Sequence, residues 1–127
     1  MMTEVLLFNI KGEKAIKIKN LCRRLYIGVR EIPREEFGVK LSALLGLSDD
    51  KSEASGSDFE EEMLYLNGFS DPMLDIFLSQ LRRQKAGVAL KAVRTDTNTN
   101  YTPYELYREI SAEREALSKG NVKVHPS

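Results

Sequence analysis

Two stretches of this sequence, one near its start and one in its middle, carry the same pattern of a buried strand followed by an amphipathic helix. Residues 4–9 read EVLLFN and residues 62–67 read EMLYLN, and each is followed by apolar residues at helical spacing. A further strand pattern begins near Gly28 in the first half and near Gly87 in the second. We therefore predict two βαβ units, which are either an internal duplication or two unrelated units of the same kind.

Hydrophobicity along the four predicted strands indicates how they are arranged. Residues 5–8 and 63–66 are continuous apolar runs, as expected of strands covered on both faces, whereas residues 28–32 and 88–93 carry charges that suit sheet edges. The predicted fold class is α/β, with one four-stranded sheet flanked by helices. We favour a parallel, doubly wound sheet of order 2-1-3-4, in which Asn9 and Asn67 converge at one edge. The alternative is a ferredoxin-like α+β sheet, in which they end on opposite edges.

An acidic segment separates the two halves, since residues 48–62 read SDDKSEASGSDFEEE. We predict a single domain over residues 1–120, with a first half at 4–46, an acidic mobile linker at 47–61, a second half at 62–119 and a frayed tail at 120–127. The linker is interpreted as a solvated surface or, alternatively, as an acidic flap. Such a flap would screen Lys14, Lys17 and Arg24 on the first helix until a partner displaces it.

Residues 94–105, RTDTNTNYTPYE, form a polar corner between the last predicted strand and the last predicted helix. Thr102 and Glu105 fit a capping box around Pro103. Thr, Asn and Asp side chains bond to backbone amides in tight turns, which is the first interpretation of the corner. The second is a ligand site, because open α/β sheets bind ligands at the carboxyl ends of strands. The candidate ligand-binding residues are Lys91, Arg94, Thr95, Asp96, Asn98, Tyr101, Asn9 and Asn67.

The same corner carries a resemblance to a known family. EMLYLNGFSDPMLDIFLSQLRR and ALKAVRTDTNTNYTPYELYREI resemble a bacterial family known only as domain of unknown function 3783 (DUF3783). The family pattern LKAV-T-TN, then an aromatic residue and ELY-E, is matched from Leu90 to Glu109, with Tyr101 where Trp is expected in many members. LLFN, LCRRL and LLGL fit its N-terminal part. The resemblance implies domain limits and no established activity.

The chain offers little for catalysis. Its one Cys, Cys22, lies on an apolar helix stripe, its one His is His125 near the C-terminus, and neither a P-loop nor a nucleophile motif is present. We expect no metal and no cofactor. A binding or regulatory module for a small ligand or a protein partner is favoured over a small enzyme that uses the polar corner.

Charge and hydropathy restrict the partners and the location. The formal net charge is zero, which argues against nucleic acid as a partner. RNA binding through an exposed strand aromatic such as Tyr65 is the weaker alternative. The sequence has no segment of membrane-span length and no signal-peptide pattern, so we expect a cytoplasmic protein without a membrane partner.

Overall fold

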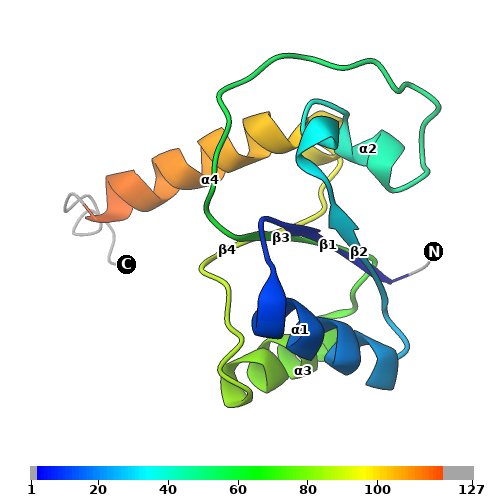
Figure 1. Ribbon diagram of the computed structural model, residues 1–127, viewed down its shortest axis with the longest axis vertical. Coiled ribbons are helices and arrows are strands. Elements are labelled where there is room, and N and C mark those ends of the chain that lie inside the picture. The colour runs from blue at the N-terminus through cyan, green and yellow to red at the C-terminus, as the bar shows by residue number, and fades with distance from the viewer. Residues whose placement is uncertain (1–2, 119–127) are drawn as a thin grey trace.

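The computed structural model describes residues 3–118, which form a central sheet between two layers of helices (Figure 1). The main elements, in chain order, are β1 (Glu4–Phe8), α1 (Gly12–Arg24), β2 (Gly28–Ile32), α2 (Leu41–Leu44), β3 (Met63–Asn67), α3 (Asp71–Arg83), β4 (Leu90–Val93) and α4 (Pro103–Ser118). Short 3-10 turns, η1 (Arg34–Glu36) and η2 (Asn98–Asn100), precede α2 and α4. The α/β fold class and the two βαβ units are confirmed.

The strands lie in the order β2-β1-β3-β4, as the sequence predicts. β1 is parallel to β2, and β3 is parallel to β4. β1 and β3, however, are antiparallel, with Glu4 opposite Asn67 and Phe8 opposite Met63. The favoured sheet therefore has the correct order, but its parallel direction throughout is wrong. The ferredoxin-like alternative anticipates the antiparallel centre but not the order.

The direction of the second βαβ unit depends on the connection between the halves. Within each half, a crossover helix returns the chain to a neighbouring parallel strand. The segment between β2 and β3 spans residues 33–62 and contains no long helix, so it can deliver β3 in either direction. Because β3 runs opposite to β1, Asn9 and Asn67 lie at opposite ends of the sheet and do not converge.

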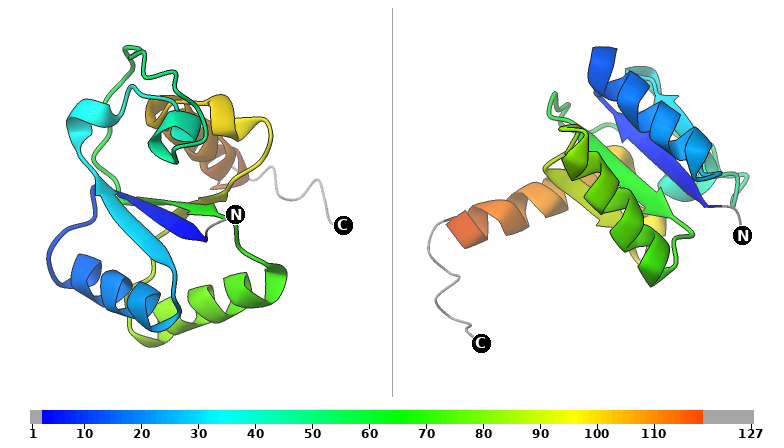
Figure 2. Two further views of the ribbon diagram at one scale, coloured as in Figure 1. Left: turned by 90° about the vertical axis from the view of Figure 1, so that its right-hand side faces the viewer. Right: turned by 90° about the horizontal axis from the view of Figure 1, so that it is seen from below.

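The two faces of the sheet are covered by different elements. α1 and α3 lie side by side on one face (Figure 2) and pack on Val5, Leu7, Leu64 and Leu66. α2, α4 and Phe59 cover the other face, where they meet Leu6, Phe8, Met63 and Tyr65. The apolar runs of β1 and β3 are fully buried because each alternate residue has a core to enter.

The acidic linker is packed against the α2–α4 face, which is the face opposite to α1 (Figure 1). Phe59 is buried and stacks on Phe37, with ring centroids 5.0 Å apart, and on Tyr107, at 4.2 Å. The linker therefore buries one apolar residue, although its acidic composition predicts a mobile segment with nothing to bury. The mobility itself stays a prediction.

The acidic flap over the first helix is wrong. The acidic side chains of the linker that form ion pairs meet other partners: Asp50 meets Lys40, Asp58 and Glu60 meet Arg34, and Glu61 meets Arg114. All of these cations lie outside α1, and the linker runs over α2 and α4 on the far side of the sheet. Glu62, which follows the linker and directly precedes β3, does meet Lys14 on α1. Position along the chain and charge alone could not show which face the linker covers.

Candidate functional site

The polar corner between β4 and α4 is a turn held by hydrogen bonds. The capping box is confirmed: the backbone N–H of Thr102 donates to Glu105 Oε1 at 2.9 Å, and the N–H of Glu105 donates to Thr102 Oγ1 at 3.2 Å. The carbonyl of Tyr101 accepts from the N–H of Leu41 at 2.8 Å, so the corner also holds the start of α2. The two capping-box bonds hold the start of α4, and the bond between Leu41 and Tyr101 joins the corner to α2.

Asn98 is the centre of this turn, and its buried side-chain amide pairs with the backbone that follows β4. The amide Nδ2 donates to the carbonyl of Val93 at 3.0 Å, and Oδ1 accepts from the N–H of Thr95 at 2.9 Å. Oδ1 also accepts from the hydroxyl of Tyr65 at 2.5 Å. Burial raises the pKa of Tyr65 to about 12, so this hydroxyl stays protonated and remains a donor.

The geometry of Asn98 imitates one residue of an added strand. The N–H of Arg94 donates to the carbonyl of Leu66 on β3, at 2.9 Å. Since backbone groups along a strand alternate in direction, those of Lys91, Val93 and Thr95 face away from β3. Asn98 bonds to the outward groups of Val93 and Thr95 and so closes the carboxyl end of this edge.

The rest of the β4 edge is open. Among residues 3–118, nothing donates to the outward carbonyl of Lys91, and nothing accepts from the N–H of Lys91 or Val93. β4 pairs with β3 alone, and Val93 is 43% exposed. An unpaired row of backbone donors and acceptors is a template for another strand.

An apolar hollow lies between the β4 edge and α3. It has a volume of about 270 Å³. Its apolar lining comes from Leu78 and Leu81 on α3 and from Val88 and Ala89 before β4. Two cations, Arg82 and Lys91, also line it. Lys91 points to this side because Leu90 and Ala92, its neighbours along the strand, pack into the core beneath α4.

On the other face of the sheet, α4 extends past β4. Leu106, Tyr107 and Ile110 pack on the core, whereas residues 112–116 are exposed. In Figures 1 and 2 the outer half of α4 projects beyond the edge of the sheet on the β4 side. A strand added to β4 would therefore lie beside the overhang of α4 on one face and the hollow of α3 on the other.

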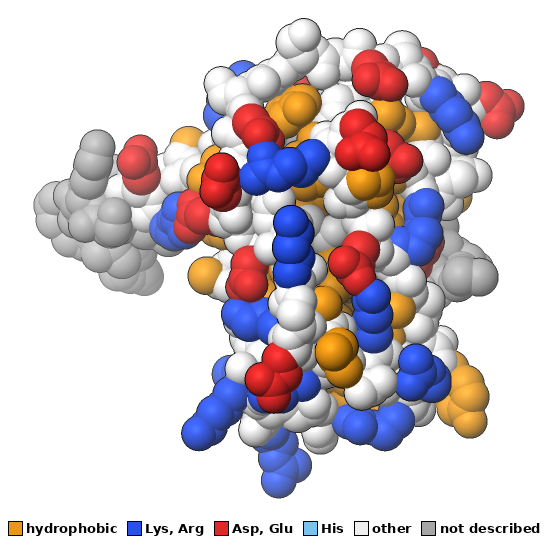
Figure 3. Space-filling model, viewed as in Figure 1, with side chains coloured by type: hydrophobic (Ala, Val, Ile, Leu, Met, Phe, Trp, Pro, Cys, Tyr) orange, Lys and Arg blue, Asp and Glu red, His pale blue; other side chains and the backbone are white. Residues whose placement is uncertain are grey.

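Basic side chains gather around α1 and α3. Figure 3 shows Lys and Arg side chains concentrated at the end of the molecule that these helices form. Within residues 3–118, several of these cations have no ion-pair partner, and this set includes Lys11, Arg24, Arg82, Arg83, Lys85 and Lys91. The charge is local, since the whole chain has a formal net charge of zero.

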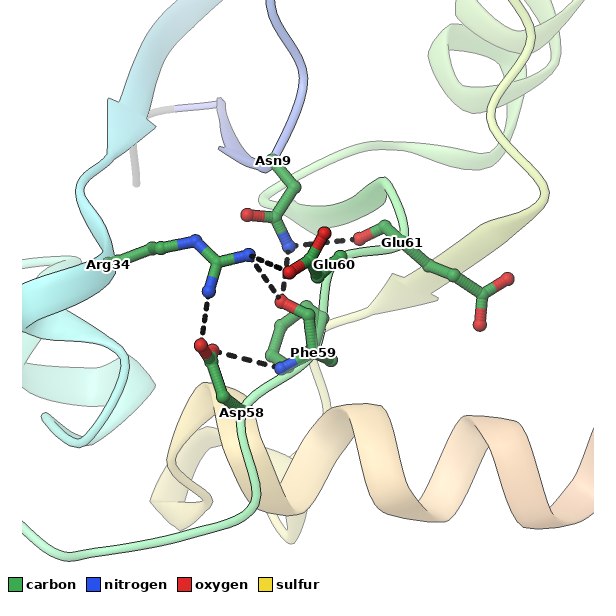
Figure 4. A network of polar contacts seen from close by, with 6 residues as sticks. All are labelled: Asn9, Arg34, Asp58, Phe59, Glu60 and Glu61. Carbon is green, nitrogen blue, oxygen red and sulfur yellow. Dashed lines mark hydrogen bonds and ion pairs between the residues drawn. The ribbon is translucent and has the colours of Figure 1, made fainter.

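Asn9, one of the candidate ligand-binding residues, contacts the linker (Figure 4). It adopts a positive φ of 62° directly after β1, and its Nδ2 donates to the carbonyls of Phe59 at 3.0 Å and Glu61 at 3.1 Å. Arg34 binds the same segment through the carbonyl of Phe59 and the carboxylate of Asp58. These contacts close the loop at the end of β1 and leave Asn9 no role at the β4 edge.

The remaining predicted site residues do not form one pocket. Arg94 and Thr95 lie at the corner, where Arg94 Nε donates to Thr99 Oγ1 at 3.2 Å. Asp96 is exposed, and Tyr101 donates its hydroxyl to Glu109 on α4 at 3.1 Å, which raises the pKa of Tyr101. Asn67 is buried at the end of β3. Of the predicted set, Lys91 alone lines the hollow beside α3.

The residue pattern does not reveal the open β4 edge as a candidate site, because the main groups of this edge are backbone atoms. The prediction of an edge strand within residues 88–93 is confirmed over Leu90–Val93, and Lys91 on this strand was the available signal. The hollow could not be found without the crossing of α3 and β4. RNA binding through Tyr65 would require an exposed ring, but Tyr65 is fully buried.

Metal binding and thiol chemistry can be examined directly in the described part of the chain. Over residues 3–118 no group of His, Cys, Asp and Glu side chains could hold a metal ion. Burial raises the pKa of the Cys22 thiol to about 12, which removes the reactive thiolate. His125 lies outside the described residues. None of the described helices has the length and hydropathy needed to cross a membrane.

Comparison with known proteins gives one family. Residues 62–117 match the model of the family described as Domain of unknown function (DUF3783). This match contains β3, α3, β4, the polar corner and nearly all of α4. The resemblance of residues 4–46 to the same family stays a prediction. Neither the curated proteins nor the solved structures gave a match. The second half of this chain, which carries the open β4 edge, is DUF3783-like.

Proposed function

We propose that this protein is a non-enzymatic binding module that takes up an extended segment of a protein partner along the β4 edge. One observation carries the proposal: the outward N–H and carbonyl of Lys91 and the outward N–H of Val93 are open within the described residues, while Asn98 occupies the carbonyl of Val93 and the N–H of Thr95. In strand addition, backbone hydrogen bonds supply affinity and neighbouring pockets supply specificity. The hollow of α3 provides such a pocket beside Lys91.

The position of a fifth strand is bounded on both faces. Leu78 and Val88 line the α3 side, and the projecting half of α4 stands over the other side. A segment that added to β4 would bury apolar surface as well as form backbone bonds, which a bare edge would not provide. This arrangement favours a partner strand over simple solvation of the edge.

The β2 edge offers a contrast within the same sheet. Its charged side chains are already paired within the chain, Arg30 with Glu4 and Glu31 with Lys19. Pro33 follows β2 directly and has no N–H to offer a partner. A hollow beside β2 is lined by four charged residues, Arg30, Glu36, Lys51 and Glu53, together with Val39, Ala43 and Leu44. The β2 edge is therefore a control surface for strand addition.

A small enzyme that uses residues 94–105 is less well supported. The side chains of Asn98, Thr102 and Glu105 are engaged with backbone groups of the corner itself. A catalytic group needs a free position beside a substrate, and these side chains lack one. The same bonds weaken the small-ligand interpretation of the corner.

The test is a titration of isotope-labelled protein with three capped hexapeptides, in which Val alternates with Thr, Glu or Lys. We expect at least one peptide to shift the amide resonances of Lys91 and Val93 and to slow their hydrogen exchange. The amides of Val29 and Glu31, which face outward on β2, should stay unchanged. Strand addition at β4 is wrong if none of the three peptides perturbs β4.

A pair of proline variants distinguishes strand addition at β4 from nonspecific peptide binding. Val93→Pro removes an outward N–H of β4 without removing a bond to β3, and Val29→Pro makes the equivalent change on β2. Loss of one backbone bond should weaken peptide binding about threefold to tenfold in Val93→Pro. Val29→Pro should bind as the unaltered protein does. Equal effects of the two variants would contradict binding at β4.

A further inference from the structure

We infer that the partner segment is acidic on the side that faces α3, so that its carboxylates meet Lys91 and Arg82. This inference rests on the proposed function and specifies the chemistry of the partner. The ammonium of Lys91 donates to the carbonyl of Val88 at 2.9 Å, and a guanidinium nitrogen of Arg82 lies 3.4 Å from Ser79 Oγ. Within residues 3–118, neither cation meets a carboxylate.

Three other cations that lie beside the sheet each have a carboxylate partner. Lys14 pairs with Glu62, Lys19 with Glu31 and Arg30 with Glu4. Lys91 is the corresponding cation on the β4 edge, and its charge is left without a counterpart. The nearby cations Arg83 and Lys85, at the end of α3, also have none within the described residues. The hollow therefore lies in a locally positive surface.

Strand geometry decides which partner side chains meet these cations. Lys91 and Val93 both point to the α3 face, because Leu90 and Ala92 enter the opposite core. Side chains directly opposite on paired strands have Cβ atoms about 5 Å apart, and opposite charges at such positions attract. An acidic residue opposite Lys91 would meet its ammonium, and a second acidic residue two positions away would lie on the same face, toward Arg82. The apolar residues between them would face the α4 side.

A second copy of this chain does not fit the same edge. Pairing two β4 strands would bring two copies of Lys91 to the same face, with Arg82 close to both. Like charges at neighbouring cross-strand positions are destabilising. Lysine on an edge strand discourages self-pairing and leaves an acidic strand as the complementary partner.

The experiment compares the affinities of the three hexapeptides at the β4 edge. We expect the Val-Glu peptide to bind most tightly and the Val-Lys peptide least, with the Val-Thr peptide between them. Exposed ion pairs contribute about 0.2–1 kcal/mol each, so two pairs correspond to about a twofold to thirtyfold gap between Val-Glu and Val-Thr. Raising the salt concentration should narrow this gap, because exposed charges are screened.

A charge reversal provides the sharper test. Lys91→Glu should invert the order, so that the Val-Lys peptide binds better than the Val-Glu peptide. Lys51→Glu, a matched reversal on the exposed linker, should leave the order unchanged. A melting curve for each variant checks that it is folded. Binding of all three peptides with equal affinity would overturn the acidic partner and leave strand addition intact.

The remaining outcomes of the peptide experiments also support or contradict the inference. Failure of every peptide at β4 would overturn the proposed function and this inference together. Dimerisation of the unaltered protein through β4, seen as amide shifts at Lys91 that depend on protein concentration, would show that a second copy is the occupant and would overturn the acidic partner. Loss of the preference for Val-Glu in Lys91→Glu, but not in Lys51→Glu, supports the inference.

Discussion

At the residue scale, Asn98 shows how one side chain can define where a sheet edge ends. Its amide has a donor and an acceptor spaced like those of a peptide group, and both bond to outward backbone groups of residues 93 and 95. The bond from Tyr65 anchors the amide in the core. The corner is thus a structural cap next to the open part of the β4 edge.

The Asn98→Ala variant should lose about 2 kcal/mol in the free energy of unfolding, because the Tyr65 hydroxyl and the carbonyl of Val93 lose their buried partner. Urea unfolding measures this loss. Asp96→Ala is the matched control, since Asp96 is exposed two residues away, and its effect should stay within about 0.5 kcal/mol. Equal stability of Asn98→Ala and the unaltered protein would contradict the role of Asn98 as a structural cap.

The sequence indicates residue types in the corner better than residue roles. Thr102, Pro103 and Glu105 follow a local rule, and a local rule can be applied without knowing the fold. The role of Asn98 depends on which backbone groups of β4 face outward, and that of Asn9 depends on where the linker returns. Both roles therefore depend on contacts between residues that are far apart in the sequence. The grouping of Asn9 with Asn67 failed for the same reason, because it required the direction of β3.

At the scale of elements, one aromatic side chain changes the role of the linker. Composition describes residues 47–61 as solvated, and the many exposed side chains agree. Phe59 is only 4% exposed, however, and Gly56 lies so close to Tyr104 that an added Cβ would come within 2.6 Å of its ring. The linker is therefore fitted onto α4 at these two points.

Phe59→Ala should cost about 3 kcal/mol, since it removes a ring stacked between Phe37 and Tyr107 and leaves a cavity in the core. It should also lower the amide order parameters of residues 56–61. Denaturant unfolding and nitrogen relaxation measure the two effects. Ser55→Ala, an exposed change in the same segment, should alter neither quantity. If Phe59→Ala leaves the free energy of unfolding unchanged, the linker is a surface loop that does not stabilise the core.

Glu61 gives the contact of the linker with α4 a dependence on pH. Hydrogen bonds from Arg114, at 2.8 and 2.9 Å, and then from Tyr107 lower the pKa of Glu61 from 4.5 to about 2. Because the folded pKa is depressed, the stabilisation is present above the unfolded pKa and is lost as pH falls from about 4.5 to 2. The effect is small, since both partners are 45% exposed.

The measurement is the free energy of unfolding as a function of pH in Glu61→Gln. This variant should show a shallower loss of stability below pH 4.5 than the unaltered protein. Glu113→Gln removes the same charge from exposed α4 and should keep the original slope. Identical slopes in all three proteins would show that the carboxylate of Glu61 is not held by α4 in solution.

At the scale of the whole molecule, the two cores share the central strands. Val5 and Leu7 belong to the α1–α3 core, whereas Leu6 and Phe8 belong to the α2–α4 core, and all four are fully buried. β3 alternates in the same way. Neither core can open without exposing a strand that the other core covers. We therefore expect one cooperative unfolding unit, although Cys22 and Phe59 lie on opposite faces of the sheet.

Thiol labelling of Cys22 tests this coupling between the faces. The side chain is buried and its pKa is raised to about 12, so labelling at pH 8 should require opening of the α1–α3 core. If the molecule opens as one unit, Phe59→Ala should speed labelling of Cys22 about a hundredfold, as expected for a loss of about 3 kcal/mol at about 1.4 kcal/mol per tenfold. Ser55→Ala should label at the original rate. A large loss of stability in Phe59→Ala with unchanged labelling would mean that the α2–α4 face opens alone, and that the sheet does not couple the two cores.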